Sequence, residues 1–267
     1  MIERRQIDAF EAPGRHDRES WLRSIFSQKI AFTYFSTQFH YVPEVPSDDA
    51  DDNLIVGRIG RQITVRENEP PDSGLHEMHR DTWRAGVFIL DPRHHEDGQK
   101  AALEKNAAIT DPLKILTALA TAINLRQPPE PYGLEVAAIT EASTFWDFVN
   151  ANRGRVTSVS FDLVTPNMFD GPENMDQELR AMRDNEHARR AKLSLENPDG
   201  LELNTDRIRG IVDYAAKGGG DIEARAKGRK SYNSRRKIRR AAVPVPDDDE
   251  SLLAEVVEFA KKIIFSL

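Results

Sequence analysis

Hydrophobic positions along the chain repeat with two periods, one helical and one typical of strands, and both occur in each half of the sequence. Apolar side chains three and four positions apart, such as Leu22, Ile25 and Phe26, predict a helix that packs on a sheet. Apolar–polar alternation, or a short run of β-branched and aromatic residues, predicts a strand instead. On these criteria the amino-terminal half contains a helix at 17–29, strands at 30–43, 54–67 and 83–92, a polar loop at 68–81, and helices at 96–109 and 111–125.

A proline-rich connector, RQPPEP at 126–131, separates this half from the next. It predicts an N-terminal part at 1–126 and a C-terminal part at 132–267, unless the two form one continuous domain. The C-terminal half contains a strand, helix and strand at 132–140, 141–154 and 155–166 that read as a β-α-β unit, charged and capped helices at 172–195 and 204–220, and a terminal amphipathic helix at 247–267.

Strands and helices therefore mix without strict alternation, which predicts an α+β fold around a mixed, mainly antiparallel sheet with packed helices. Two helix starts have clear local signals. Asp111 followed by Pro112 is typical of an N-cap and first helical residue, and Asn204 or Thr205 can cap the helix that the glycines at 218–220 end.

Composition agrees with a folded chain that needs no covalent cross-links. The 267 residues suffice for one large or two smaller domains, and 39% hydrophobic with 30% charged residues excludes wholesale disorder. The absence of cysteine excludes disulfides, thiolate metal sites and cysteine nucleophiles. The amino terminus lacks the apolar core of a signal peptide, and no window resembles a membrane span of about 20 apolar residues. We therefore expect a cytoplasmic protein without membrane contact.

Charge changes this picture, because it is distributed unevenly. The chain carries a net charge of -7, yet residues 217–240 contain ten basic and two acidic residues, a net charge of +8. The other 243 residues therefore carry -15. An acidic body with one concentrated basic segment is the strongest pattern in the sequence.

The basic segment predicts a β-hairpin within 220–245, followed by the terminal helix. Residues 221–227 alternate as a strand does, 237–245 are compatible with a second strand, and 228–236 would form the turn. A phosphate-binding P-loop is excluded by spacing, because a helix precedes the glycines and no Gly-Lys pair is present.

We expect this hairpin to bind the phosphate backbone of DNA or RNA without sequence-specific readout, with Tyr232 at the tip stacking on a base. The predicted nucleic-acid-binding residues are Arg225, Lys227, Arg229, Lys230, Tyr232, Arg235, Arg236, Lys237, Arg239 and Arg240. Two alternatives stay open. The hairpin could pair with the chain's own acidic runs at 48–52 or 247–250, or it could dock on an acidic protein partner.

Histidines suggest an enzyme as the second hypothesis. His76 and His79 have a spacing that suits a divalent metal, and His94 and His95 follow a predicted buried strand. If the two segments converged, they would form a metal-dependent phosphodiesterase or nuclease centre. No other cofactor is expected, and no catalytic residue can be named.

A third hypothesis is a protein-interaction or assembly subunit, in which the terminal amphipathic helix or the acidic surface meets another protein or a second copy of the chain. In general style, a cysteine-free α+β chain with a basic carboxy-terminal hairpin resembles uncharacterised bacterial proteins of mobile-element or antiviral-defence islands. No motif assigns it to a family.

Overall fold

The computed structural model describes residues 2–4, 17–44, 54–95, 98–165, 179, 181–182, 185–242, 255–259 and 262. The chain separates into two compact units. Unit 1 comprises residues 1–94, 99–136 and 242–267, and unit 2 comprises residues 95–98 and 137–241. Each unit has its own antiparallel sheet and its own helices, so the α+β fold is confirmed.

Unit 1 is built on a five-stranded sheet whose strands follow one another in sequence, in the order β2-β3-β4-β5-β6. A separate two-stranded sheet joins β1 and β7. The elements of unit 1 are β1 (Ile2–Arg4), α1 (Arg18–Phe26), β2 (Ile30–Tyr34), β3 (Thr37–Pro43), β4 (Ile55–Asn68), η1 (Pro71–Ser73), β5 (Glu77–Asp91), β6 (Lys100–Leu103), α2 (Pro112–Asn124) and β7 (Tyr132–Leu134).

Helices α1 and α2 supply one side of the main core of unit 1, and the five-stranded sheet supplies the other. Leu22 of α1 and Leu119 of α2 lie in the same cluster as Phe39, Tyr41 and Phe88 of the sheet. Helix α2 begins as the sequence predicts, since the Asp111 carboxylate accepts a hydrogen bond from the backbone N–H of Lys114. Asp17, which was not predicted as a cap, caps α1 in the same way through the backbone N–H of Ser20. Burial of these apolar side chains is the main stabilising term of the unit.

A second apolar cluster in unit 1 includes the carboxy-terminal segment. Residues 255–259 are helical, and Val256 and Val257 pack against Leu54, Val87 and Ile89. These two valines are thus packed within the chain, which removes them from the apolar face that the assembly hypothesis assigned to the terminal helix.

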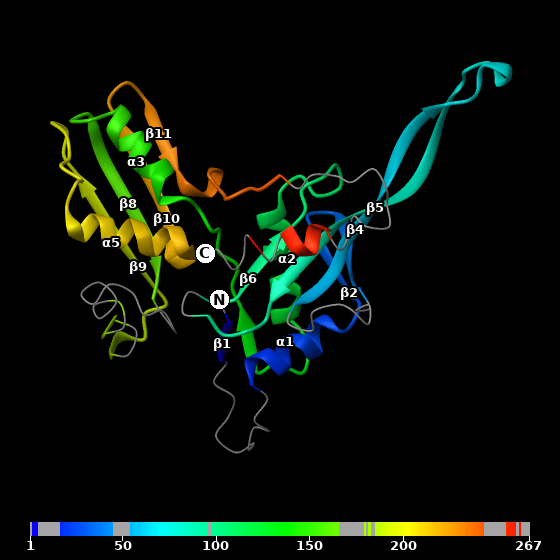
Figure 1. Cartoon of the computed structure of the whole chain (residues 1–267), viewed down its shortest axis with the longest axis horizontal. Helices are drawn as coiled ribbons and strands as arrows, with labels where there is room; N and C mark the ends of the chain where they lie inside the picture. Colours follow the sequence, from blue (N-terminus) through cyan, green and yellow to red (C-terminus); the bar gives the residue numbers. More distant parts are fainter. Residues whose placement is uncertain are drawn as a thin grey trace. The chain divides into compact units, whose positions relative to one another are not determined.

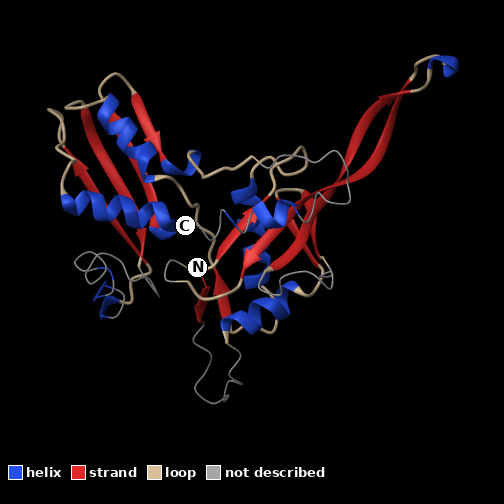
Figure 2. Ribbon diagram, viewed as in Figure 1, coloured by secondary structure: helices blue, strands red, loops and turns tan. Residues whose placement is uncertain are grey.

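Strands β4 and β5 form an arm that extends beyond the five-stranded sheet (Figures 1 and 2). They pair continuously from Ile55↔Leu90 to Asn68↔Glu77, whereas β3 pairs with β4 only as far as Gly60 and β6 pairs only with Phe88–Asp91 of β5. Residues 61–68 and 77–84 are therefore a two-stranded ribbon, which we call the β4–β5 arm.

Unit 2 is a four-stranded antiparallel sheet, in the order β11-β10-β8-β9, with α3 and α5 on one face (Figure 1). Its elements are α3 (Ala142–Ala151), β8 (Val156–Val164), β9 (Arg190–Glu196), α5 (Asp206–Tyr214), the π-helical turn η2 (Ala215–Gly219), β10 (Gly220–Ala226), β11 (Lys230–Asn233) and η3 (Ser234–Arg236). Thr205 caps α5, and Gly218, at φ 95°, ends the helical path as predicted.

The structure corrects four predicted elements in which a local pattern conflicted with tertiary pairing. The strand predicted at 30–43 is a hairpin, because the chain turns at Phe35 and Ser36. Residues 77–81 of the predicted loop at 68–81 belong to strand β5 of the arm. The segment 96–109, predicted as a helix, contains β6, and the end of the helix predicted at 172–195 is β9. In each case pairing with a neighbouring strand outweighed a weak local preference.

The predicted β-α-β unit is also wrong. β7 pairs with β1 in unit 1, whereas β8 pairs with β9 and β10 in unit 2. Helix α3 therefore does not connect two strands of one sheet.

Candidate nucleic-acid interface

The basic hairpin forms, but it is shorter than the sequence suggests. β10 pairs with β11 from Glu223↔Asn233 to Ala226↔Lys230, so the turn is 227–229. The predicted second strand at 237–245 is not formed in its described part, 237–242, apart from one bridge between Ile238 and Thr140. The shorter turn is accommodated by Gly228 and Arg229, whose φ angles are 81° and 61°.

The turn of the hairpin lies beside two other turns of unit 2. The backbone N–H of Lys227 donates to the Arg155 carbonyl at 2.9 Å, and the Lys227 ammonium reaches the Asp199 carbonyl at 3.5 Å. The backbone at Gly154 and Gly200 is also in close contact, since a Cβ added at Gly200 would lie 2.5 Å from the Gly154 oxygen. Three loops distant in sequence thus meet at one end of the sheet.

This meeting gathers five cations, which we call the basic end: Arg153, Arg155, Lys227, Arg229 and Lys230. All five residues are exposed. Within the part of the chain that the structure describes, none of them forms an ion pair with a carboxylate. Asp199 is exposed in the adjoining turn and offsets one of the charges. Because none of the five cations has a carboxylate partner among the described residues and Asp199 offsets only one charge, the basic end keeps a net positive charge and can bind a polyanion electrostatically.

Sequence reasoning missed Arg153 and Arg155. The signal was the tetrapeptide NRGR at 152–155, where Gly154, at φ 65°, follows α3 and places an arginine on each side of the turn. Only the pairing of β8 with β10 brings that turn to the hairpin.

The basic end is a local concentration of charge within unit 2. Over residues 95–98 and 137–241 the sequence contains 19 Lys or Arg and 18 Asp or Glu, a net charge of only +1. Arg225 lies next to the basic end, exposed on the sheet face opposite to the helices, with Ser158 and Ser231 as its cross-strand neighbours.

The structure overturns the role expected for Tyr232. Tyr232 is only 6% exposed, lies opposite Ala224 on the helix-covered face, and packs against Phe145 and Phe148 with ring centroids 5.6 and 5.8 Å away. Its hydroxyl is 2.9 Å from that of Thr144. Burial raises the pKa of Tyr232 above its ordinary value. This ring is a core residue and offers no stacking surface at the tip.

The remaining predicted cations follow β11, at the other end of β10. Arg235 donates to the Asp221 carboxylate from Nε at 2.9 Å and lies 2.7 Å from it through Nη2. This hydrogen bond and the negative charge of Asp221 raise the pKa of the Arg235 guanidinium above its ordinary value. One cation of this group is therefore neutralised within the chain. Arg236, Lys237 and Arg240 are exposed, and Arg239 is half-buried.

The acidic runs of the alternative hypothesis, 48–52 and 247–250, lie outside the described residues. The pairing that the structure does show for the basic segment, Arg235 with Asp221, is local to unit 2.

The histidines do not converge. His76 and His79 lie at the far end of the β4–β5 arm, and His94 and His95 follow the opposite end of β5. The twelve strand residues between His79 and His94, at 3.3 Å each, separate the two pairs by roughly 40 Å. No group of three or more His, Cys, Asp or Glu residues able to hold a metal occurs among the described residues. The predicted metal centre is therefore wrong as a convergent site, because the loop thought to carry His76 and His79 is an extended arm.

Comparison of the chain with protein-family models, curated proteins and solved structures finds no significant match. Within the described residues, no helix combines the length and the apolar character needed to cross a bilayer.

Proposed function

We propose that the protein binds nucleic acid through the basic end of unit 2, by contact with the phosphate backbone and without reading base sequence. The observation that carries the proposal is the convergence of Arg153 and Arg155 with Lys227, Arg229 and Lys230, all exposed and without carboxylate partners among the described residues.

The chemistry of the site favours phosphate over other acceptors. Arginine presents a planar fork of donors that matches phosphate oxygens, and three of the five cations are arginines. The basic end presents neither an aromatic platform nor an amide side chain, so it offers charge without a pattern that could discriminate bases. Binding of this kind is dominated by counterion release.

A salt titration tests the proposal. If about five phosphates are neutralised, log K for duplex DNA falls against log salt with a slope of about -4.5. Replacing Arg153 and Arg229 with Gln removes two of these contacts and changes the slope to about -2.7. Fluorescence anisotropy measures the slopes of the unmodified protein and of the variant, with a labelled 20-base-pair duplex and with a labelled single strand.

A matched control changes the same net charge elsewhere. Lys105 and Lys192 are exposed outside the basic end, and their double substitution with Gln should leave the slope within error of that of the unmodified protein. The proposal fails if the unmodified protein does not bind at low salt, or if the control variant loses as much affinity as the basic-end variant.

A further inference from the structure

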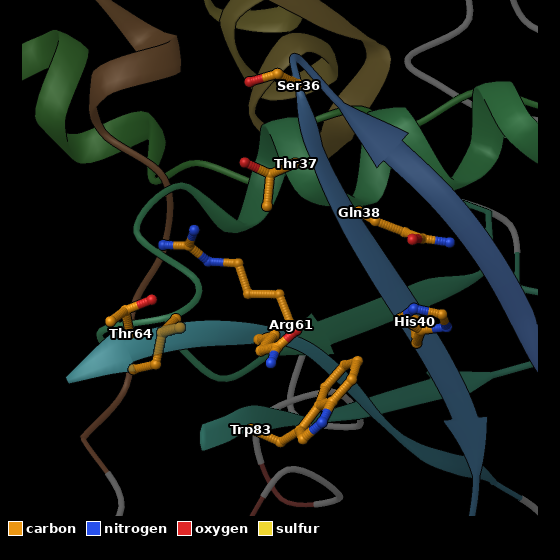
Figure 3. A pocket seen from close by; sticks show the side chains of 9 residues that line it. Ser36, Thr37, Gln38, His40, Arg61, Thr64 and Trp83 are labelled. Carbon is orange, nitrogen blue, oxygen red and sulfur yellow. The ribbon is translucent and has the colours of Figure 1, made fainter. Parts of the chain in front are cut away.

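A pocket in unit 1 has the chemistry of a nucleobase site and uses no residue of the basic end. It lies where β3 and β4 diverge at the base of the β4–β5 arm (Figure 3). It is an open hollow with a volume of about 560 Å³. This volume is in the range of small-ligand sites. The lining residues are Ser36, Thr37, Gln38, His40, Arg61, Gln62, Ile63, Thr64 and Trp83.

The aromatic surface of the pocket is Trp83 on β5. Trp83 is 61% exposed. This is unusual for a tryptophan, because exposure forgoes the free energy gained when the large ring is buried. The ring is nevertheless held in place: β5 is paired at this point with Gln62 of β4, and the His40 ring contacts the indole in a T-shaped arrangement with centroids 5.4 Å apart. An ordered, open indole provides a stacking surface at little entropic cost.

The cation of the pocket is Arg61. Its Nε donates to the Ala108 carbonyl at 3.1 Å, and its guanidinium lies 5.7 Å from the centroid of the Phe39 ring. Both contacts fix the side chain. Among the described residues, its two terminal nitrogens have no hydrogen-bond acceptor, so they are available to a phosphate.

The polar lining favours a base over a sugar. Gln38 and Gln62 each offer an amide donor and acceptor, the pattern that pairs with base edges. None of the nine lining residues carries a carboxylate, so the lining does not repel a phosphate. Asp81 lies just outside, where its carboxylate accepts a hydrogen bond from Thr64 at 2.8 Å.

We infer that this pocket binds a nucleobase that stacks on Trp83, with Arg61 binding its phosphate. The inference rests on the proposed function only for the source of the base, which is then an unpaired nucleotide of a single strand. A duplex buries its base faces in the stack and cannot offer one to the indole, so the pocket gives the protein a preference for single strands.

Tryptophan fluorescence tests the site directly, because Trp21 is only 5% exposed and Trp83 is the most exposed of the three tryptophans. We expect adenosine 5′-monophosphate to protect Trp83 from acrylamide quenching, and inorganic phosphate not to do so. Protection by a single-stranded oligonucleotide identifies the strand as the source of the base, and protection by the mononucleotide alone identifies a free nucleotide. Absence of protection by both overturns the inference.

Substitution of Trp83 provides the second readout. Trp83→Ala should weaken single-strand binding roughly ten-fold and leave duplex binding unchanged, while Trp83→Phe retains much of the affinity because a smaller ring still stacks. Leu125→Ala, at an apolar residue that is 72% exposed outside the pocket, controls for a general surface effect. Equal single-strand affinities of Trp83→Ala and the unmodified protein would overturn the inference.

The two proposals fail separately. If neutralising the basic end abolishes strand binding but the mononucleotide still protects Trp83, the base site stands alone. If both nucleic acids bind with the expected salt slope while Trp83 is never protected, the basic end stands and the base site is wrong.

Discussion

Tyr232 lies within the basic segment, where its ring could be a core residue or a nucleic-acid contact. Two substitutions of Tyr232 distinguish these roles. The Thr144 hydroxyl donates to the Glu141 carbonyl at 2.8 Å, so its single hydrogen is used. The phenol of Tyr232 must then be the donor across the 2.9 Å contact with Thr144. Tyr232→Phe removes only this hydrogen bond, whereas Tyr232→Ala also removes the packing against Phe145 and Phe148.

The expected losses follow from these contacts. A net intramolecular hydrogen bond contributes about 1 kcal/mol, which we expect Tyr232→Phe to remove from the free energy of unfolding. Loss of a buried aromatic ring and the resulting cavity costs about 3–5 kcal/mol, which we expect for Tyr232→Ala. Urea unfolding followed by circular dichroism measures both values, and hydrogen exchange in β8 and β10 shows whether the loss is confined to unit 2.

Binding decides between the two roles. At a temperature where both forms are folded, Tyr232→Phe should bind single strands and duplexes as the unmodified protein does, because the ring faces the core. A variant with unchanged stability and weaker single-strand binding would refute the core assignment.

Two further predictions concern buried or paired polar groups. Asp221→Asn removes the charge partner of Arg235, which lies outside the basic end, so we expect the duplex salt slope to equal that of the unmodified protein; a slope steeper by about 0.9 in the anisotropy titration would show that Arg235 contacts a phosphate and would contradict the confinement of binding to the basic end. The Tyr41 hydroxyl donates to the Phe26 carbonyl at 2.8 Å, and burial raises the pKa of this phenol. The neutral phenol therefore contributes fully to the stability of the fold below pH 10, and this contribution is lost as the pH rises toward the higher pKa of the folded state. The unfolding free energy of the unmodified protein should therefore fall more steeply above pH 10 than that of Tyr41→Phe, and equal slopes would show that the phenol is not buried.

The parts of the fold that were predictable are those in which residues close in sequence determine the local structure. The cap at Asp111, the cap at Thr205 and the glycine stop at Gly218 each depend on neighbours within a few residues, and all three are found as expected. The arm was not predictable, because residues 77–81 are exposed and, apart from Met78, polar, and they become a strand only by pairing with β4.

The candidate interface, likewise, was predictable in part from the sequence and depended in part on tertiary structure. The density of cations at 225–240 was visible in the sequence, and it led to the proposal that a polyanion binds there. Which cations face solvent depended on register: Tyr232 and Ala224 share the buried face of a strand pair, and a shift of one residue would have reversed them.

The sequence by itself determined the α+β class, the helix boundaries with strong caps and the concentration of positive charge, because these depend on composition and on interactions between near neighbours. Tertiary structure alone decided that Arg153 and Arg155 join the hairpin turn, that Asp221 neutralises Arg235, that the histidine pairs lie far apart, and that Trp83 stands open beside His40. Each of these depends on strand pairing between distant segments, and pairing register is a property of the folded sheet that no local pattern contains.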